Sequence, residues 1–185
     1  MKSLMLLGIV SLSLYACGND DPPLTDLGGI YAISSWTHNS TACDVVGAEE
    51  TPPFSHFMVY EATFLVSFVQ FAFCESVTAC REQIDRNSIA LGNGAVFDDG
   101  SDVQGWTSRF ITATSTDDAC TGVYIDQFLS NPTSEVVQFT SRTKIIESFP
   151  RDTDDACTIE AVEERAGDVP CSDLSVATGD LVESI

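Results

Sequence analysis

The clearest pattern along the chain is an alternation of apolar and polar positions in its second half. The alternating segments are Trp106–Thr114, Gly122–Leu129 and Val136–Ile146. Clusters of Asp, Gly, Ser, Asn and Pro, which favour turns, precede and separate them at 98–101, 115–118 and 131–133. Strands of eight to eleven residues joined by short turns predict an antiparallel meander.

The first half of the chain contains further strand candidates. Gly29–Thr37 alternates well enough for a first strand, and Ser88–Phe97 leads into the expected turn at 98–101. Phe54–Phe73 is the most hydrophobic stretch and is long enough to suggest a membrane span. Glu61 lies inside it, however, and a charge near the centre of a span costs about 2.5–3.5 kcal/mol. The aromatic and β-branched content therefore predicts one long or two consecutive core strands.

Two short helices are expected, each starting at a cysteine. Cys74–Arg86 is rich in helix-forming residues, and Cys157–Arg165 fits an amphipathic helix. Gly167 and Pro170 would end the second helix. The chain after Ser172 is short, and its pattern leaves open whether it lies along the domain or is loose.

The N-terminus has the pattern of an export signal. One basic residue, Lys2, precedes an apolar run from Leu4 to Tyr15, which is shorter than the roughly 20 residues of a transmembrane helix. Leu14-Tyr15-Ala16-Cys17 resembles the lipobox of bacterial lipoproteins, with Tyr15 where that family prefers a small residue. The resemblance implies that the Cys17 thiol receives diacylglycerol, that cleavage occurs before it, and that the new amine is acylated, for example with palmitate. The alternative is an ordinary secretory signal that ends beside a cysteine.

The chain is therefore expected to have three parts. Residues 1–16 are the signal peptide, residues 17–27 are the lipidated cysteine and a tether, and residues 28–185 form one β-rich domain. In the lipoprotein family an Asp directly after the cysteine favours the inner membrane. Gly18 occupies that position, so the resemblance implies a protein exported and lipid-anchored in the cell envelope, at the outer membrane.

The pattern predicts a mainly β fold, an antiparallel meander that closes into a barrel or sandwich with one or two short helices. The segment Gly28–Trp36 and the meander from about 88 to 146 resemble lipocalin-like bacterial lipoproteins. Gly29-Ile30-Tyr31 places Tyr where the lipocalin signature has Trp. The resemblance implies a barrel of the kind that binds a small apolar ligand.

Charge excludes one class of partner. The chain has 28 Asp and Glu residues against 8 Lys and Arg, a formal net charge of −20 at pH 7. A surface this acidic repels phosphate backbones, so nucleic acid is not expected as a partner. A solvated, repelling surface is sufficient to explain the acidity.

Seven cysteines are an odd number, and assigning Cys17 to the lipid leaves six disulfide candidates. Export implies an oxidising compartment and three disulfides, with fifteen pairings open. If residues 74–83 are helical, Cys74 and Cys80 lie about 9 Å apart along the axis, which predicts a distant partner for each. Cys157 and Cys171 could pair across the last helix. No Cys/His spacing typical of zinc is present. The six candidates are Cys43, Cys74, Cys80, Cys120, Cys157 and Cys171.

Candidate catalytic and metal-binding residues are few, and no cofactor is expected. His38 and His56 are the only histidines, and neither belongs to a recognisable catalytic motif, so packing or surface roles are expected. Asp98, Asp99 and Asp102 could bind calcium, because hard cations prefer clustered carboxylates. Their spacing does not match the twelve-residue calcium loop, and Asp also favours turns.

The sequence favours a non-enzymatic envelope lipoprotein that binds a small apolar ligand or a protein partner. The alternative is a secreted hydrolase whose active site the sequence does not reveal. A closed cavity lined by residues such as Phe64, Phe68 and Phe110 would support ligand binding. A cleft that brings His38 or His56 within hydrogen-bond reach of a Ser and an Asp would support catalysis.

Overall fold

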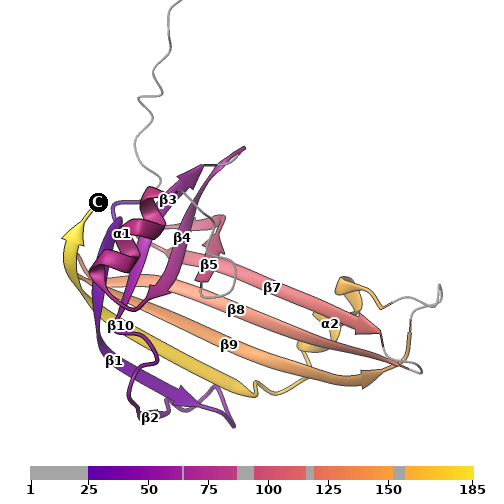
Figure 1. Ribbon diagram of the computed structural model, residues 1–185. Helices are drawn as coiled ribbons and strands as arrows, with labels where there is room; N and C mark the ends of the chain where they lie inside the picture. Colours follow the sequence, from indigo (N-terminus) through magenta and orange to yellow (C-terminus); the bar gives the residue numbers. More distant parts are fainter. Residues whose placement is uncertain (1–24, 64, 87–93, 116–118, 152–156) are drawn as a thin grey trace, which may run out of the picture.

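An antiparallel sheet of nine strands curls into a nearly closed barrel, with a tenth short strand at its side (Figure 1). The computed structural model describes residues 25–63, 65–86, 94–115, 119–151 and 157–185. The strands are β1 (Gly29–Asn39), β2 (Ala48–Glu49), β3 (His56–Thr63), β4 (Ser67–Cys74), β5 (Gly94–Phe97), β6 (Asp99–Ser101), β7 (Gly105–Ser115), β8 (Cys120–Thr133), β9 (Val136–Phe149) and β10 (Asp173–Ser184). The described helices are α1 (Val77–Asp85) and α2 (Ile159–Ala166).

The barrel is a meander whose two ends pair with each other. The strand order is β5-β4-β3-β1-β10-β9-β8-β7-β6, and β2 pairs with β1 outside this path. β10 pairs with β1 from Leu174↔Asn39 to Ser184↔Gly29, which joins the last strand to the first. The ladder is interrupted at Asp98, because β5 pairs with β4 whereas β6 pairs with β7. This interruption makes the barrel nearly closed.

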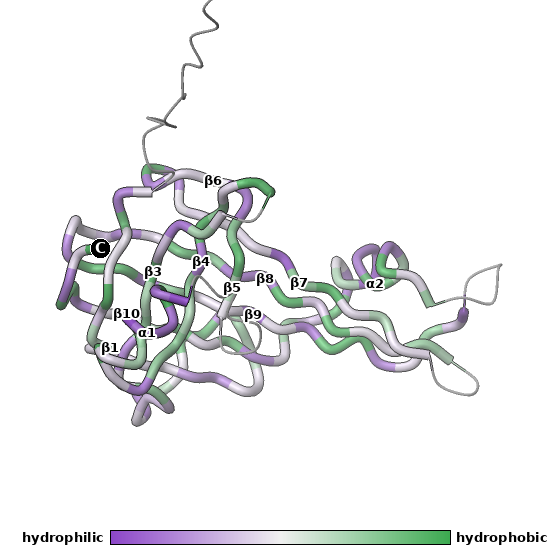
Figure 2. Tube along the Cα trace, turned by 45° about the horizontal axis from the view of Figure 1, so that its top comes forward, coloured by the Kyte–Doolittle hydropathy of each residue, from purple (hydrophilic) through white to green (hydrophobic). Residues whose placement is uncertain are grey.

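Side chains fill the barrel interior. The interior cluster includes Tyr31, Phe57, Phe97 and Trp106, which are all buried. Both faces of β3 and β4 are covered, one by this interior cluster and the other by α1. Double burial explains why 54–73 is continuously hydrophobic rather than alternating, and these strands are largely green in Figure 2.

The strands β7, β8 and β9 extend past the barrel, and α2 packs on their outer face (Figure 1). Thr158 caps this helix by accepting a hydrogen bond from the Ala161 amide. Val162 of the helix lies directly over Gly122 of β8, where a Cβ atom would come within 2.4 Å of Val162 Cγ2. The absence of a side chain at Gly122 therefore allows the close contact between helix and sheet.

The predicted mainly β fold with short helices is confirmed. The hydrophobic stretch forms two consecutive strands, β3 and β4, and the segments expected as helices contain α1 and α2. The expected turn at 131–133 is wrong, because Asn131–Thr133 continues β8 through a register shift and the turn falls at 134–135. The expected turn at 98–101 is also wrong, because it contains the short strand β6 and the turn follows at 102–104.

The chain after Ser172, whose pattern leaves open whether it lies along the domain or is loose, forms a principal strand. β10 lies between β1 and β9, so the residues from Asp173 to Ser184 complete the barrel. At the other end of the domain Thr25 and Leu27 are buried, although both fall within the expected tether, residues 17–27. The packed domain therefore includes Thr25.

Three disulfides join the six candidate cysteines. They are Cys43–Cys171, Cys74–Cys80 and Cys120–Cys157, with Cα atoms 5.4, 5.5 and 5.5 Å apart. The expectation of distant partners for Cys74 and Cys80 is wrong. Cys74 ends β4 instead of starting a helix, and α1 begins only after the N-cap Ser76, so the two cysteines approach each other. The possible pairing of Cys157 with Cys171 is likewise not found.

Some expectations fall outside the described residues. They include the signal peptide, Cys17, most of the tether, Phe64, the first part of the segment Ser88–Phe97 and most of the turn at 115–118.

Candidate functional site

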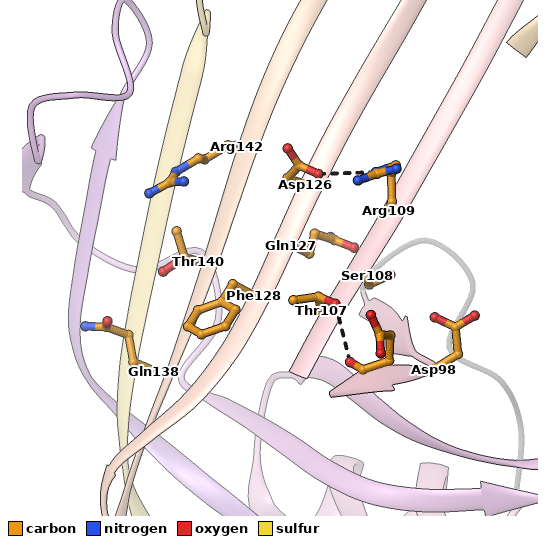
Figure 3. A pocket seen from close by; sticks show the side chains of 11 residues that line it. Asp98, Thr107, Ser108, Arg109, Asp126, Gln127, Phe128, Gln138, Thr140 and Arg142 are labelled. Atoms are coloured by element: carbon orange, nitrogen blue, oxygen red, sulfur yellow. Dashed lines mark hydrogen bonds and ion pairs between the residues drawn. The ribbon is translucent and has the colours of Figure 1, made fainter. Parts of the chain in front are cut away.

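A hollow of the described surface lies on the outer face of β7, β8 and β9, beside α2. It has a volume of about 810 Å³, within the range of small-molecule sites. Its wall is built from two rows of residues paired across the three strands. The rows are Thr107–Phe128–Thr140 and Arg109–Asp126–Arg142, and all six side chains belong to the face that α2 covers further along. We call this site the outer hollow (Figure 3).

The second row carries both positive charges of the outer hollow. Arg109 lies between two carboxylates, with Nε 3.6 Å from Asp126 Oδ1 and Nη1 2.5 Å from Glu163 Oε1 of α2. Its guanidinium also lies over the Tyr124 ring at 5.5 Å. Tyr124, Asp126 and Glu163 together raise the pKa of Arg109. The guanidinium of Arg109 therefore already has partners within the protein.

The side chain of Arg142 differs from that of Arg109 in having no hydrogen bond or ion pair with any described residue. Figure 3 shows Asp126 directed towards Arg109, whereas the Arg142 side chain points away from both. The chain has only 8 Lys and Arg residues against 28 acidic ones. An exposed arginine without a partner in such a chain offers its five N–H donors to a ligand.

Phe128 supplies an apolar surface in the same hollow. Its ring lies over Gly105, where an added Cβ atom would be 2.3 Å from Phe128 Cζ. Gly105 also has a φ of +86°, a backbone conformation that favours glycine. The ring remains 38% exposed, so it presents a flat apolar surface to the hollow while its other face packs on Gly105.

Hydrogen-bond acceptors complete the outer hollow. Asp98, which links β5 to β6, and Asp99, the first residue of β6, are both exposed at its edge. Thr107 donates to the Asp99 carbonyl oxygen at 3.4 Å. Gln138 and Thr140 lie on the opposite side (Figure 3). The outer hollow therefore combines guanidinium and amide donors, carboxylate acceptors and one aromatic ring.

The three calcium candidates do not converge. Asp98 and Asp99 line the outer hollow, whereas Asp102 accepts hydrogen bonds from Thr25 Oγ1, the Asp26 amide and Trp106 Nε1, at 2.6, 2.6 and 2.7 Å. Among the described residues no three His, Cys, Asp or Glu side chains are grouped so as to hold a metal ion. The role of Asp102 is to join the start of the domain to the β6–β7 turn.

The histidines are also accounted for by structural contacts. His38 Nε2 lies 2.6 Å from Asp173 Oδ2, and Nδ1 lies 3.8 Å from Glu50 Oε2. The hydrogen bond with Asp173 raises the pKa of His38. His56 Nδ1 contacts the hydroxyl of its neighbour Ser55 at 2.7 Å. Ser175 pairs with His38 across β1 and β10, but its hydroxyl donates to Asp173 at 3.4 Å. Among the described residues neither histidine side chain therefore bonds to both a serine and a carboxylate, which is the arrangement that would have supported hydrolysis.

The two described phenylalanines among those expected around a closed cavity, Phe68 and Phe110, do not meet. Phe68 is buried beneath α1 on the outside of the barrel, whereas Phe110 is 56% exposed on β7. Sequence reasoning missed the outer hollow, because its members are common residue types spread over five segments. The available signal was the outward polar set of β7–β9, which becomes a site only once the strand register is known.

Comparison of the chain with protein-family models, with curated proteins and with solved structures finds no match. No helix in the described ranges is both long enough and apolar enough to span a membrane.

Proposed function

We propose that this protein is a lipid-anchored protein of the cell envelope that binds a small, hydroxyl-rich ligand, such as a saccharide, in the outer hollow without catalysing a reaction. The observation that carries the proposal is the free guanidinium of Arg142 in one hollow with three carboxylates and the exposed ring of Phe128. The ligand class follows from the mixture of these groups.

A charged ligand fits the outer hollow less well than a polyhydroxylated one. An anion would meet Asp98, Asp99 and Asp126, and a cation would meet Arg142. A hydroxyl group both donates and accepts hydrogen bonds, so it can pair with carboxylates on one side and with guanidinium and amide groups on the other. The C–H face of a sugar ring would pack on Phe128.

The filled barrel gives no support to an apolar ligand in its interior. The ring of Phe71 touches the ring of Phe139 from the opposite wall, with centroids 4.1 Å apart. We therefore place ligand binding on the outside of the sheet. A small apolar ligand and a protein partner are the competing expectations. The binding test distinguishes an apolar ligand from a saccharide.

The cysteines support the anchor. Six of the seven pair within the domain, which leaves Cys17 of the lipobox-like segment for lipidation. Replacing Cys17 by Ser should release the protein from the membrane fraction and abolish incorporation of a clickable palmitate analogue. A variant that stays membrane-bound, beside a wild-type protein that never incorporates the label, would overturn the anchor.

Binding can be tested with a panel of neutral oligosaccharides, with uronic-acid oligosaccharides as the anionic comparison that should bind less well, using NMR chemical shifts to measure affinity. Arg142→Gln should weaken the best binder by about tenfold or more, because a charge-assisted hydrogen bond contributes about 1.5–3 kcal/mol. Phe128→Leu should also weaken it, because the flat aromatic face on which the sugar ring packs is lost. Arg86→Gln, an exposed arginine at the end of α1, is the matched control and should bind as the wild type does.

Two results would overturn the proposed ligand class. One is a panel in which no oligosaccharide binds, and the other is binding that neither hollow variant weakens. Tight binding of the apolar fluorophore N-phenyl-1-naphthylamine, with no oligosaccharide competing, would favour the apolar ligand instead.

A further inference from the structure

Exposed aliphatic side chains gather at the end of the barrel where the described chain begins. Leu65 and Val66 lie in the β3–β4 turn and are 86% and 72% exposed. Val103 lies in the β6–β7 turn and is 96% exposed. We call the surface formed by Leu65, Val66 and Val103 the tether end.

Strand pairing places these turns at one end of the barrel. β3 passes Gly29, the first residue of β1, at Val59 and continues in the same direction to Thr63, so its turn lies beyond the start of β1. Asp102, next to Val103, accepts hydrogen bonds from Thr25 Oγ1 and the Asp26 amide. The β6–β7 turn is therefore held beside the segment that leads into β1.

The length of chain before Thr25 limits how far this end can stand from an anchor. Eight residues run from Cys17 to Leu24, and a fully extended chain of that length spans at most about 26–29 Å. Because hydrogen bonds to Asp102 fix Thr25 and Asp26, the tether end must stay close to the bilayer that holds Cys17. Isolated exposed aliphatic residues are ordinary on proteins, but these project from two turns on the side that faces the anchor.

We infer that the tether end docks on the lipid bilayer, with Leu65, Val66 and Val103 entering the interface between head groups and acyl chains. The inference rests on the proposed lipid anchor, which supplies most of the attachment. Each buried methylene contributes about 0.8 kcal/mol, so a few aliphatic side chains suffice to orient a domain that is already anchored.

The acidic residues near the tether end determine which head-group charge the docking tolerates. Asp26, Asp98 and Asp99 are exposed near the tether end. An anionic surface would repel them. Docking therefore favours a zwitterionic surface and weakens as anionic lipid is added.

The test places tryptophan at the proposed contact and measures quenching by brominated phosphatidylcholine in vesicles. Leu65→Trp and Val103→Trp are compared with Ile159→Trp, an exposed site on α2 at the far end of the sheet, after subtraction of the wild-type signal. Full-length lipidated protein is reconstituted in one arm. In a second arm the mature chain is held by an N-terminal histidine tag on phosphatidylcholine vesicles containing nickel-chelating lipid.

Leu65→Trp and Val103→Trp should be quenched at least twofold more than Ile159→Trp in every arm that retains the protein. Added phosphatidylglycerol should reduce the difference. Equal quenching at the three sites, or none, would overturn the docking. A protein that does not reconstitute through Cys17 but shows the difference in the nickel arm would overturn the anchor alone.

Discussion

The ring of Phe71 in β4 stacks on the ring of Phe139 in β9, with centroids 4.1 Å apart and planes 10° apart, although three strands separate β4 from β9 along the sheet. The two rings join opposite walls of the barrel. Both residues are buried, so this contact belongs to the core rather than to a ligand cavity.

Phe139→Ala should remove this contact and destabilise the fold. Truncating a buried phenylalanine to alanine typically costs about 3–5 kcal/mol, because burial is lost and a cavity remains. Phe110→Ala, at a half-exposed position on β7, is the control and should cost much less. Urea unfolding followed by circular dichroism measures both, and equal losses would contradict a filled barrel.

The contact between Gly122 and Val162 makes a reciprocal prediction. Gly122→Ala should cost about 1–3 kcal/mol, because the added Cβ atom would lie 2.4 Å from Val162 Cγ2. Val162→Ala removes that atom, so the cost of Gly122→Ala should fall in the Val162→Ala background. A double-mutant cycle measures this coupling. Purely additive effects would show that α2 does not sit on Gly122.

The disulfides should differ in how much each contributes to the free energy of unfolding. Replacing both members of Cys43–Cys171, which are separated by 128 positions, should cost about 5 kcal/mol in the chain-entropy treatment. The Cys74–Cys80 pair, separated by 6 positions, should contribute about 2 kcal/mol. Peptide mapping under non-reducing conditions tests the connectivity, and unfolding of the two double-alanine variants tests the order. A Cys157–Cys171 peptide would contradict the pairing.

His38 should make stability depend on pH. Its pKa is raised, chiefly by the hydrogen bond with Asp173, with Glu50 also nearby. The protonated imidazole therefore stabilises the fold fully below its unfolded pKa of about 6.5, and this contribution is lost as pH rises through the higher folded pKa. His38→Gln should lower the free energy of unfolding more at pH 5.5 than at pH 9. Asp173→Asn should remove the same pH dependence, and an unchanged profile in both variants would contradict the pairing.

Much of the barrel was predictable because alternation and turn residues mark its strands locally. β10 was not, since two of its inward positions are Ala177 and Gly179. A Cβ atom at Gly179 would lie 2.4 Å from the Phe57 ring, so small size is required there. A strand whose inward residues must be small carries little hydrophobic signal. Such a strand is recognised only once the large aromatic rings that face it from other strands are known, as Phe57 faces Gly179.

The disulfides and the outer hollow were beyond prediction for another reason. The pairing of Cys74 with Cys80 depends on where β4 ends and α1 begins, and Ser76 decides this boundary by capping the helix. The neighbourhood of Arg109, Asp126 and Arg142 depends on strand register across 33 positions of sequence. One sequence shows the residue types, but only the fold shows which of them share a row.

The hydrogen bonds of Asp102 determine where mechanical load enters the molecule. With the proposed anchor at Cys17, a pull from the membrane would reach the domain through its N-terminal segment. Because Thr25 and Asp26 are bonded to Asp102, tension would reach the β6–β7 turn as well as β1. The hydrogen bonds to Asp102 and the burial of Thr25 and Leu27 would therefore resist the pull ahead of strand β1, which is paired on both sides by β3 and β10.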